Sequence, residues 1–159
     1  MLGLMKINMK TIATYAVWII AFEAISFATA QVTNKNIDTW YATLTAPPMV
    51  PPNWIFPVMW SILYALIACA GCLLWRRGEK PALTLFTIYM LLNWSWSFIY
   101  FGLHMIGTGL VEIILMDILI ALIIVKTWRP VKPAALLLMP LMAWSLFATY
   151  LNGGYWWLN

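Results

Sequence analysis

Three carboxylates interrupt stretches of sequence that are otherwise almost free of charge, and they are the first candidates for chemistry. Glu23, Glu112 and Asp117 lie within apolar runs that contain no lysine or arginine to pair with them. Acids inside a membrane are costly and often functional, and a close pair could act as general acid and general base. Glu112 and Asp117, however, lie about 140° apart around a helix. We therefore expect separate hydrogen bonds to hydroxyl, amide or indole groups rather than a paired acid–base site.

Aromatic residues at helical spacing offer a different chemistry, which is the stacking of a flat apolar ligand. The residues that share a helix face are Trp60 with Tyr64, then Tyr89, Asn93, Trp96 and Tyr100, and finally Trp144 with Ala148. Such stripes more often serve packing than a pocket. Asn93 nevertheless needs a polar partner within a membrane, and either another helix or a ligand could supply it.

The remaining reactive residues favour no catalytic or metal site. Cys69 and Cys72 form a C-x-x-C inside an apolar run, where we interpret them as packing residues, and His104 is the single histidine. The sequence shows no catalytic triad, no glycine-rich phosphate loop and no cluster of metal ligands. We therefore predict no catalytic residue, no metal and no cofactor, and we do not expect an enzyme.

The elements that would position these residues follow from composition. The chain of 159 residues is 64% hydrophobic and 9% charged, whereas soluble domains carry about 25% charged residues. A helix needs about 20 apolar residues to cross the hydrocarbon core. The apolar runs cover residues 11–32, 54–75, 81–103, 106–125 and 133–151. They predict an all-α membrane protein, a bundle of five transmembrane helices in a single domain over residues 1–159.

The first run has a second interpretation. Lys6 and Lys10 precede it, and Ala28-Thr29-Ala30 resembles a signal-peptidase site, so a cleaved signal peptide is an alternative. Glu23 and the length of the run favour a retained helix.

Lysines and arginines are distributed unevenly between the two sides of such a bundle. Five spans place Lys35 on one side and the other eight basic residues on the side of the N-terminus. By the positive-inside rule, the N-terminus is cytoplasmic and the C-terminus lies outside. These charges act as topology signals, so the net charge of +4 does not indicate a nucleic-acid partner.

The predicted loop between the first two helices, over residues 33–53, is long and rich in proline. Pro47, Pro48, Pro51 and Pro52 restrict their own backbone and that of the preceding residue. Tryptophans flank these prolines and suit the membrane interface. The loop is therefore expected to be a stiff lid on the outer side, although an interfacial anchor without a ligand is an equally simple interpretation.

Three stretches of the sequence resemble the TspO/MBR family of tryptophan-rich sensory proteins, whose mitochondrial members are also called peripheral benzodiazepine receptors. These stretches are "WYATLTAPPMVPPNWIFPVMWSILY" from Trp40 to Tyr64, "LNWSWSFIYFG" from Leu92 to Gly102, and "MPLMAWSLFATYLN" from Met139 to Asn152. The resemblance covers nearly the whole chain, and its first motif is specific. It implies a five-helix bundle whose first loop caps a pocket, and a homodimer; the departures described below favour a bacterial member in the cell membrane.

The resemblance also implies ligands and the residues that bind them. The ligands are porphyrins such as protoporphyrin IX and haem, together with isoquinoline and benzodiazepine drugs. By position, the ligand-binding residues are Tyr41, Trp60, Tyr64, Asn93, Trp96, Tyr100, Trp144 and Ala148. Light-dependent porphyrin breakdown is a side activity that the resemblance associates with such sites, and Trp60 and Trp144 are the rings we would assign to it.

This chain departs from the family pattern at positions that affect ligand preference. Ala46 replaces a lysine and Met49 replaces a tryptophan in the loop motif. No basic residue follows Tyr150, so the sterol motif proposed for animal members is incomplete, and cholesterol is not expected as a partner.

The sequence thus favours a membrane protein that binds and senses porphyrins. Two rival functions remain open. One is a transporter that moves a small apolar ligand by alternating access, although no internal repeat favours it. The other is a regulatory membrane subunit that has no porphyrin ligand.

Overall fold

Five long helices account for most of the chain. The structure is a computed structural model that describes residues 8–159, and the described residues contain helices and connections but no strand. The elements are α1 (Met9–Ile37), η1 (Tyr41–Thr43), α2 (Ile55–Arg77), α3 (Lys80–Ser97), the π-helical η2 (Phe98–Gly102), α4 (Ile106–Thr127) and α5 (Lys132–Leu158). Each of the five spans, with α3 and η2 taken together, is long and apolar enough to cross a membrane.

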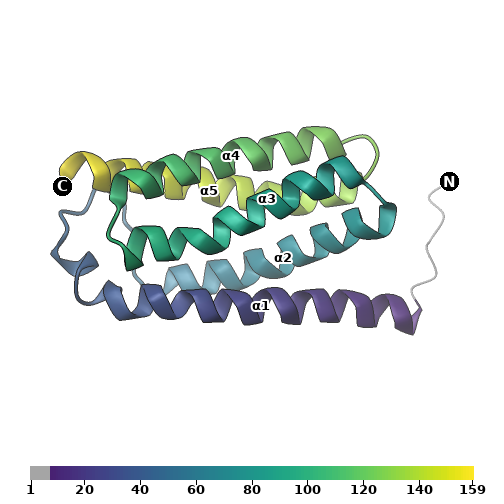
Figure 1. The fold of residues 1–159 in the computed structure, drawn as a ribbon, viewed down its shortest axis with the longest axis horizontal. Helices are drawn as coiled ribbons and strands as arrows, with labels where there is room; N and C mark the ends of the chain where they lie inside the picture. Colours follow the sequence, from purple (N-terminus) through teal and green to yellow (C-terminus); the bar gives the residue numbers. More distant parts are fainter. Residues whose placement is uncertain (1–7) are drawn as a thin grey trace.

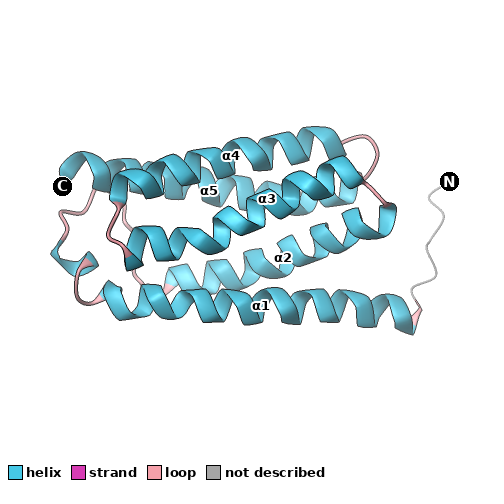
Figure 2. Cartoon of the chain, viewed as in Figure 1, coloured by secondary structure: helices cyan, strands magenta, loops and turns pink. Residues whose placement is uncertain are grey.

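The helices lie side by side along the long axis of the molecule (Figure 1). α4 packs against α5 and α3, and α2 packs against α1 and α5. The connections between the helices are short except for residues 38–54, which lie between α1 and α2 at the same end of the bundle as the C-terminus (Figure 2). The predicted all-α architecture with five spanning helices is confirmed.

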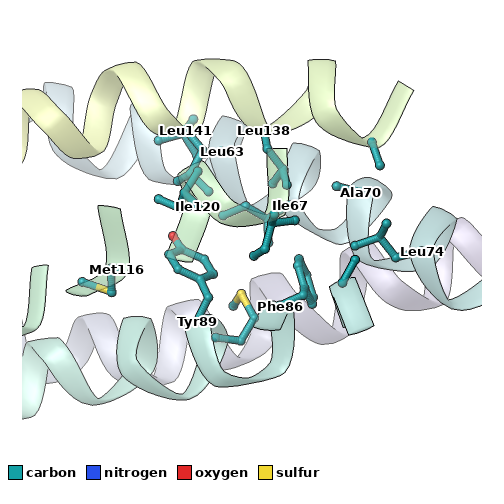
Figure 3. Packing of buried hydrophobic residues seen from close by; sticks show 14 of the residues in the cluster. Leu63, Ile67, Ala70, Leu74, Phe86, Tyr89, Met116, Ile120, Leu138 and Leu141 are labelled. Atoms are coloured by element: carbon teal, nitrogen blue, oxygen red, sulfur yellow. The ribbon is translucent and has the colours of Figure 1, made fainter. Parts of the chain in front are cut away.

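The interior is built from side chains of α2, α3, α4 and α5. Figure 3 shows Tyr89 and Phe86 of α3 among aliphatic residues of the other helices, including Leu63, Ile67 and Leu141. Lipid chains are as apolar as leucine, so close packing and hydrogen bonds between helices stabilise such a core more than the exclusion of water does. These buried helices therefore form the rigid part that positions the candidate site.

α1 is peripheral. Of its 29 residues only Thr11 is buried, and Val17 and Phe27 are 65% and 72% exposed. Such a surface is suited to acyl chains. Polar contacts hold both ends of α1: Arg76 donates to the Thr11 hydroxyl over 3.2 Å, and the hydroxyl of Thr33 lies 3.4 Å from that of Ser97.

Four helices end later than predicted, α2 and α4 by two residues and α1 and α5 by five or more. α1 continues to Ile37 rather than ending at 32, because its polar last turn contains no helix-breaking residue and Asn36 bonds to the Val32 carbonyl. α5 continues to Leu158 rather than ending at 151, through Gly153 and Gly154, a pair that usually favours a helix end. In the third span, the α-helical part ends at Ser97 and the π-helical turn η2 completes it.

Basic residues gather at one end of the bundle. Lys10 lies in the first turn of α1, and Arg76 and Arg77 end α2. The other basic residues at this end are Lys80, Lys126, Arg129 and Lys132. Lys6, which contributed to the predicted orientation, lies outside the described residues. Lys35, at the end of α1, is the one basic residue described at the opposite end.

Candidate functional site

Residues 38–54 are held against the bundle by aromatic contacts. Trp40 stacks on His104 with 4.2 Å between ring centroids and meets Tyr100 and Phe101 edge-on. His104 also lies within hydrogen-bonding distance of Asn36, at 3.1 Å. The beginning of the connection is thereby joined to η2 and to the end of α1.

The proline-containing part of the connection is fastened to α5. Pro47 is buried, and its ring lies so close to Gly154 that a Cβ at that glycine would be 2.5 Å from the Pro47 Cβ. Asn159 accepts a hydrogen bond from the Thr45 amide and donates one to the Thr45 carbonyl, at 2.8 and 3.1 Å. Tyr150 donates to the Pro48 carbonyl. The continuation of α5 through its glycine pair therefore provides the surface to which the connection binds.

Tyr41 lies between these two attachments. Its ring contacts Phe101 at 5.4 Å and Tyr155 at 4.9 Å. Burial, followed by a hydrogen bond that it shares with Tyr155, raises the pKa of the Tyr41 hydroxyl above its ordinary value. Tyr41 is thus a neutral, partly buried residue that joins η1 to α5 and η2.

Two of the predicted wall residues, Tyr64 and Asn93, are hydrogen-bonded to each other. The Tyr64 hydroxyl donates to Asn93 Oδ1, and Asn93 Nδ2 donates to the Tyr89 hydroxyl over 3.3 Å. The three residues of this hydrogen-bonded series, Tyr64, Asn93 and Tyr89, are all buried. The partner that Asn93 requires is therefore supplied by neighbouring helices.

Trp96 and Tyr100 form a second pair. Their rings stack with centroids 4.8 Å apart, and the Trp96 indole donates to the Gly109 carbonyl over 3.1 Å. A Cβ at Gly109 would lie 2.7 Å from the Tyr100 ring, so the glycine permits this close approach. Tyr100 is only 2% exposed, whereas Trp96 is half-buried.

The α5 residues of the predicted site carry polar atoms that lack partners. Trp144 packs edge-on against Phe56, and its Nε1 is buried without a hydrogen-bond partner. Two turns further along, Asn152 is buried, and its Oδ1 also has none, although its Nδ2 donates to the Ala148 carbonyl over 2.8 Å. Ala148 lies between them at helical spacing. A free donor and a free acceptor thus flank a small residue on one face of α5.

Two of the three intramembrane acids, Glu112 and Asp117, have hydroxyl partners, as expected from the sequence, whereas Glu23 makes no side-chain hydrogen bond with the described residues. Ser95 donates to Glu112 over 2.6 Å, and both Ser145 and Thr149 donate to Asp117. Glu112 therefore joins α4 to α3, while Asp117 joins α4 to α5. The second oxygen of Glu112 is buried without a partner. The two carboxylates serve different interfaces and form no shared acid–base pair.

The eight predicted binding residues thus fall into three groups. In the first group, Trp60 contacts Tyr64, which hydrogen-bonds to Asn93. In the second group, Trp96 stacks on Tyr100, and Phe101 contacts both Tyr100 and Tyr41. Trp144 and Ala148 form the third group and pack against the core cluster that contains Tyr64. Among the described residues, no group of three or more histidine, cysteine or acidic side chains is arranged to hold a metal ion.

Sequence reasoning missed three residues of this region. Asn152 repeats the helical spacing of Trp144 and Ala148, so extending that stripe by one turn would have found it. Tyr155 and Phe101 receive the ring of Tyr41. They gave no comparable signal, because their role depends on how residues 38–54 lie.

Comparison with known proteins places the chain in one family. The profile of the TspO/MBR family matches residues 10–158. The chain is 38% identical over 148 residues to the tryptophan-rich protein TspO of Chlorobaculum tepidum, covering 90% of this chain and 94% of that protein. It is 40% identical over 145 residues to TspO of Archaeoglobus fulgidus, covering 89% and 94%. It is 37% identical over 124 residues to the translocator protein of Homo sapiens, covering 74% and 73%. With its five apolar helices, the chain is an integral membrane protein that belongs to the TspO/MBR family.

Proposed function

We propose that this protein binds and senses porphyrins, such as protoporphyrin IX and haem, and similar flat apolar ligands that include isoquinoline and benzodiazepine drugs. The ligand lies along α5 beneath residues 38–54, which act as a lid. The N-terminus faces the cytoplasm, because the basic residues gather at the end of the bundle where α1 begins, and the lid therefore lies on the outer side.

The pair of unpartnered atoms on α5 is the observation that carries this proposal. A buried polar group without a hydrogen bond costs about 1–3 kcal/mol. Trp144 Nε1 needs an acceptor and Asn152 Oδ1 needs a donor, and the two residues are about 12 Å apart along the helix. A tetrapyrrole carries two propionate side chains at its edge; such a group accepts a hydrogen bond as a carboxylate and donates one as a carboxylic acid. It therefore offers both missing partners within one rigid, planar molecule.

Burial divides the predicted binding residues into two roles. Trp60, Trp144 and Ala148 are half-buried and pack on the core, so they supply the surface that a ligand contacts first. Tyr64 and Asn93 are already bonded to each other and buried, and they form the wall behind it. Each good aromatic contact with the macrocycle adds about 0.5–1.5 kcal/mol beyond burial.

Titration of the purified protein in detergent with protoporphyrin IX, followed by tryptophan quenching, tests this function. Trp144→Phe keeps an aromatic ring but removes the N–H group, and loss of a hydrogen bond to a carboxylate should weaken binding about tenfold or more. Trp94→Phe is the matched control, because the indole of Trp94 is also buried without a partner but packs against Phe22 of α1.

The outcomes separate the proposal from its rivals. Saturable quenching supports the α5 site if the affinity for protoporphyrin IX falls in Trp144→Phe and not in Trp94→Phe. Equal affinities in both variants would move the site elsewhere in the bundle. No saturable quenching in the unsubstituted protein would favour a regulatory subunit without a porphyrin ligand. Release of bound porphyrin across sealed vesicles would instead indicate a transporter.

A further inference from the structure

A recess lies at the end of the bundle opposite to residues 38–54. It has a volume of about 230 Å³ and is lined by Asn8, Lys10, Thr11, Thr14, Trp75 and Arg76. These residues come from the first turns of α1 and the last turn of α2. The recess is smaller than the roughly 300–1,000 Å³ of sites for drug-sized molecules, so it suits a compact chemical group and not a tetrapyrrole.

The lining of this recess is cationic and rich in hydrogen-bond donors. Lys10 and Arg76 supply two positive charges, Thr11 supplies a hydroxyl, and no acidic residue contributes to the lining. The Thr14 hydroxyl also lines the recess but donates to the Lys10 carbonyl. The first turn of α1 also contains no acid. Anions bind favourably where such charges meet the N-terminus of a helix. Asn8 caps α1 and accepts from the Thr11 amide, so the charges and the Thr11 hydroxyl are the main attraction. The chemistry of the recess therefore matches an anion with several oxygen acceptors.

Arg76 is already oriented for this role. Its Nη2 donates to the Thr11 hydroxyl over 3.2 Å, and its guanidinium carbon lies 5.8 Å from the centre of the Tyr15 ring. Both contacts fix the side chain at the mouth of the recess. A guanidinium has five N–H donors in a planar fork, and the hydrogen bond to Thr11 leaves others available to a phosphate.

We propose that this recess binds the phosphate group of an anionic phospholipid. The site is distinct from the porphyrin site and does not depend on it. Trp75, which is 55% exposed, forms one wall, and tryptophan settles at the level of lipid headgroups. The recess also lies at the ends of two spanning helices, where the headgroups of the surrounding bilayer are the nearest phosphates. A lipid is thus favoured over a free phosphate ion.

Native mass spectrometry of the detergent-solubilised protein, titrated with phosphatidylglycerol and separately with phosphatidylcholine, tests this site. Lys10→Gln and Arg76→Gln should each weaken the first phosphatidylglycerol-binding event about tenfold or more, because each removes a charge-assisted contact. Arg129→Gln is the matched control, since it removes an equal charge from the same end of the bundle, at an exposed position outside the recess. Thermal midpoints without lipid establish that the variants fold, and Lys10→Gln disturbs no side-chain contact of Arg76.

Each result decides the question. The proposal is supported if the protein binds one phosphatidylglycerol saturably and both recess variants lose this binding. Arg129→Gln should keep it, and excess inorganic phosphate should not displace the lipid. Equal losses in all three variants would show diffuse attraction by the basic end and overturn it. Displacement by inorganic phosphate would make the recess a free-anion site and overturn the lipid assignment, and so would equal binding of phosphatidylcholine.

Discussion

Gly153 and Gly154 of α5 should respond in opposite ways to the same substitution. Neither has a positive φ, so alanine fits the backbone at both positions. In a helix, alanine is favoured over glycine by about 0.8–1.0 kcal/mol. A Cβ at Gly153 has its nearest neighbour at 4.0 Å, whereas a Cβ at Gly154 would lie 2.5 and 2.8 Å from ring atoms of Pro47. Gly153→Ala should therefore be neutral or stabilising, while Gly154→Ala should force residues 38–54 away from α5.

The size of the difference follows from the cost of overpacking. An extra methyl group in a closely packed site costs about 1–3 kcal/mol, and the proline ring cannot rotate away as the tip of a flexible side chain would. The gain in helix propensity is the same at both glycines, so it cancels when the two variants are compared. The lid should open more readily in Gly154→Ala than in Gly153→Ala by a factor of about 5 to 150.

Amide hydrogen exchange measures this opening directly. The Thr45 amide donates to Asn159, so its exchange reports how often the lid leaves α5. The expected result is faster exchange over residues 40–53 in Gly154→Ala, with Gly153→Ala close to the unsubstituted protein. Equal exchange in the two alanine variants would refute the contact between Pro47 and Gly154 as the fastening of the lid.

Two further substitutions test the polar contacts of the interior. Asp117→Ala leaves the hydroxyls of Ser145 and Thr149 without their acceptor and should lower the free energy of unfolding by about 1–3 kcal/mol. Asp117→Asn keeps an oxygen acceptor and should lower it less. Equal thermal midpoints for the two variants would contradict the role of Asp117 as the acceptor. Tyr64→Phe removes the donor to Asn93 and should also cost about 1–3 kcal/mol, yet protoporphyrin affinity should stay within about threefold if Tyr64 forms the wall and not the contact surface. A large loss of affinity with an unchanged midpoint would reverse these roles.

The sequence was sufficient for the number of helices and for the chemistry around Glu112 and Asp117. Long apolar runs admit few alternatives in lipid, because the backbone must satisfy its own hydrogen bonds there. The absence of intramembrane cations left hydroxyl groups among the few possible partners for Glu112 and Asp117, and the structure shows serine and threonine in that role.

Helix ends and ring contacts were harder to predict, because they depend on tertiary packing. Local propensity favours a helix end at Gly153 and Gly154, yet the contact with Pro47 requires the helix to continue there. Whether Asn93 faces a ligand or a neighbouring helix could not be decided from its spacing, and Tyr64 and Tyr89 now account for both of its ends. Such pairings across helices leave no pattern in a single sequence.

The peripheral position of α1 has a consequence for how this protein tolerates change. The exposed side chains of its outward face have no fixed neighbour in the bundle and suit fluid acyl chains, so an apolar replacement such as Val17→Leu or Phe27→Leu should be tolerated there. Ile67 of α2 is fully buried, and there the shape of the side chain matters as much as its polarity. A saturation library would therefore rank substitutions in α1 by hydropathy and those in α2 by volume.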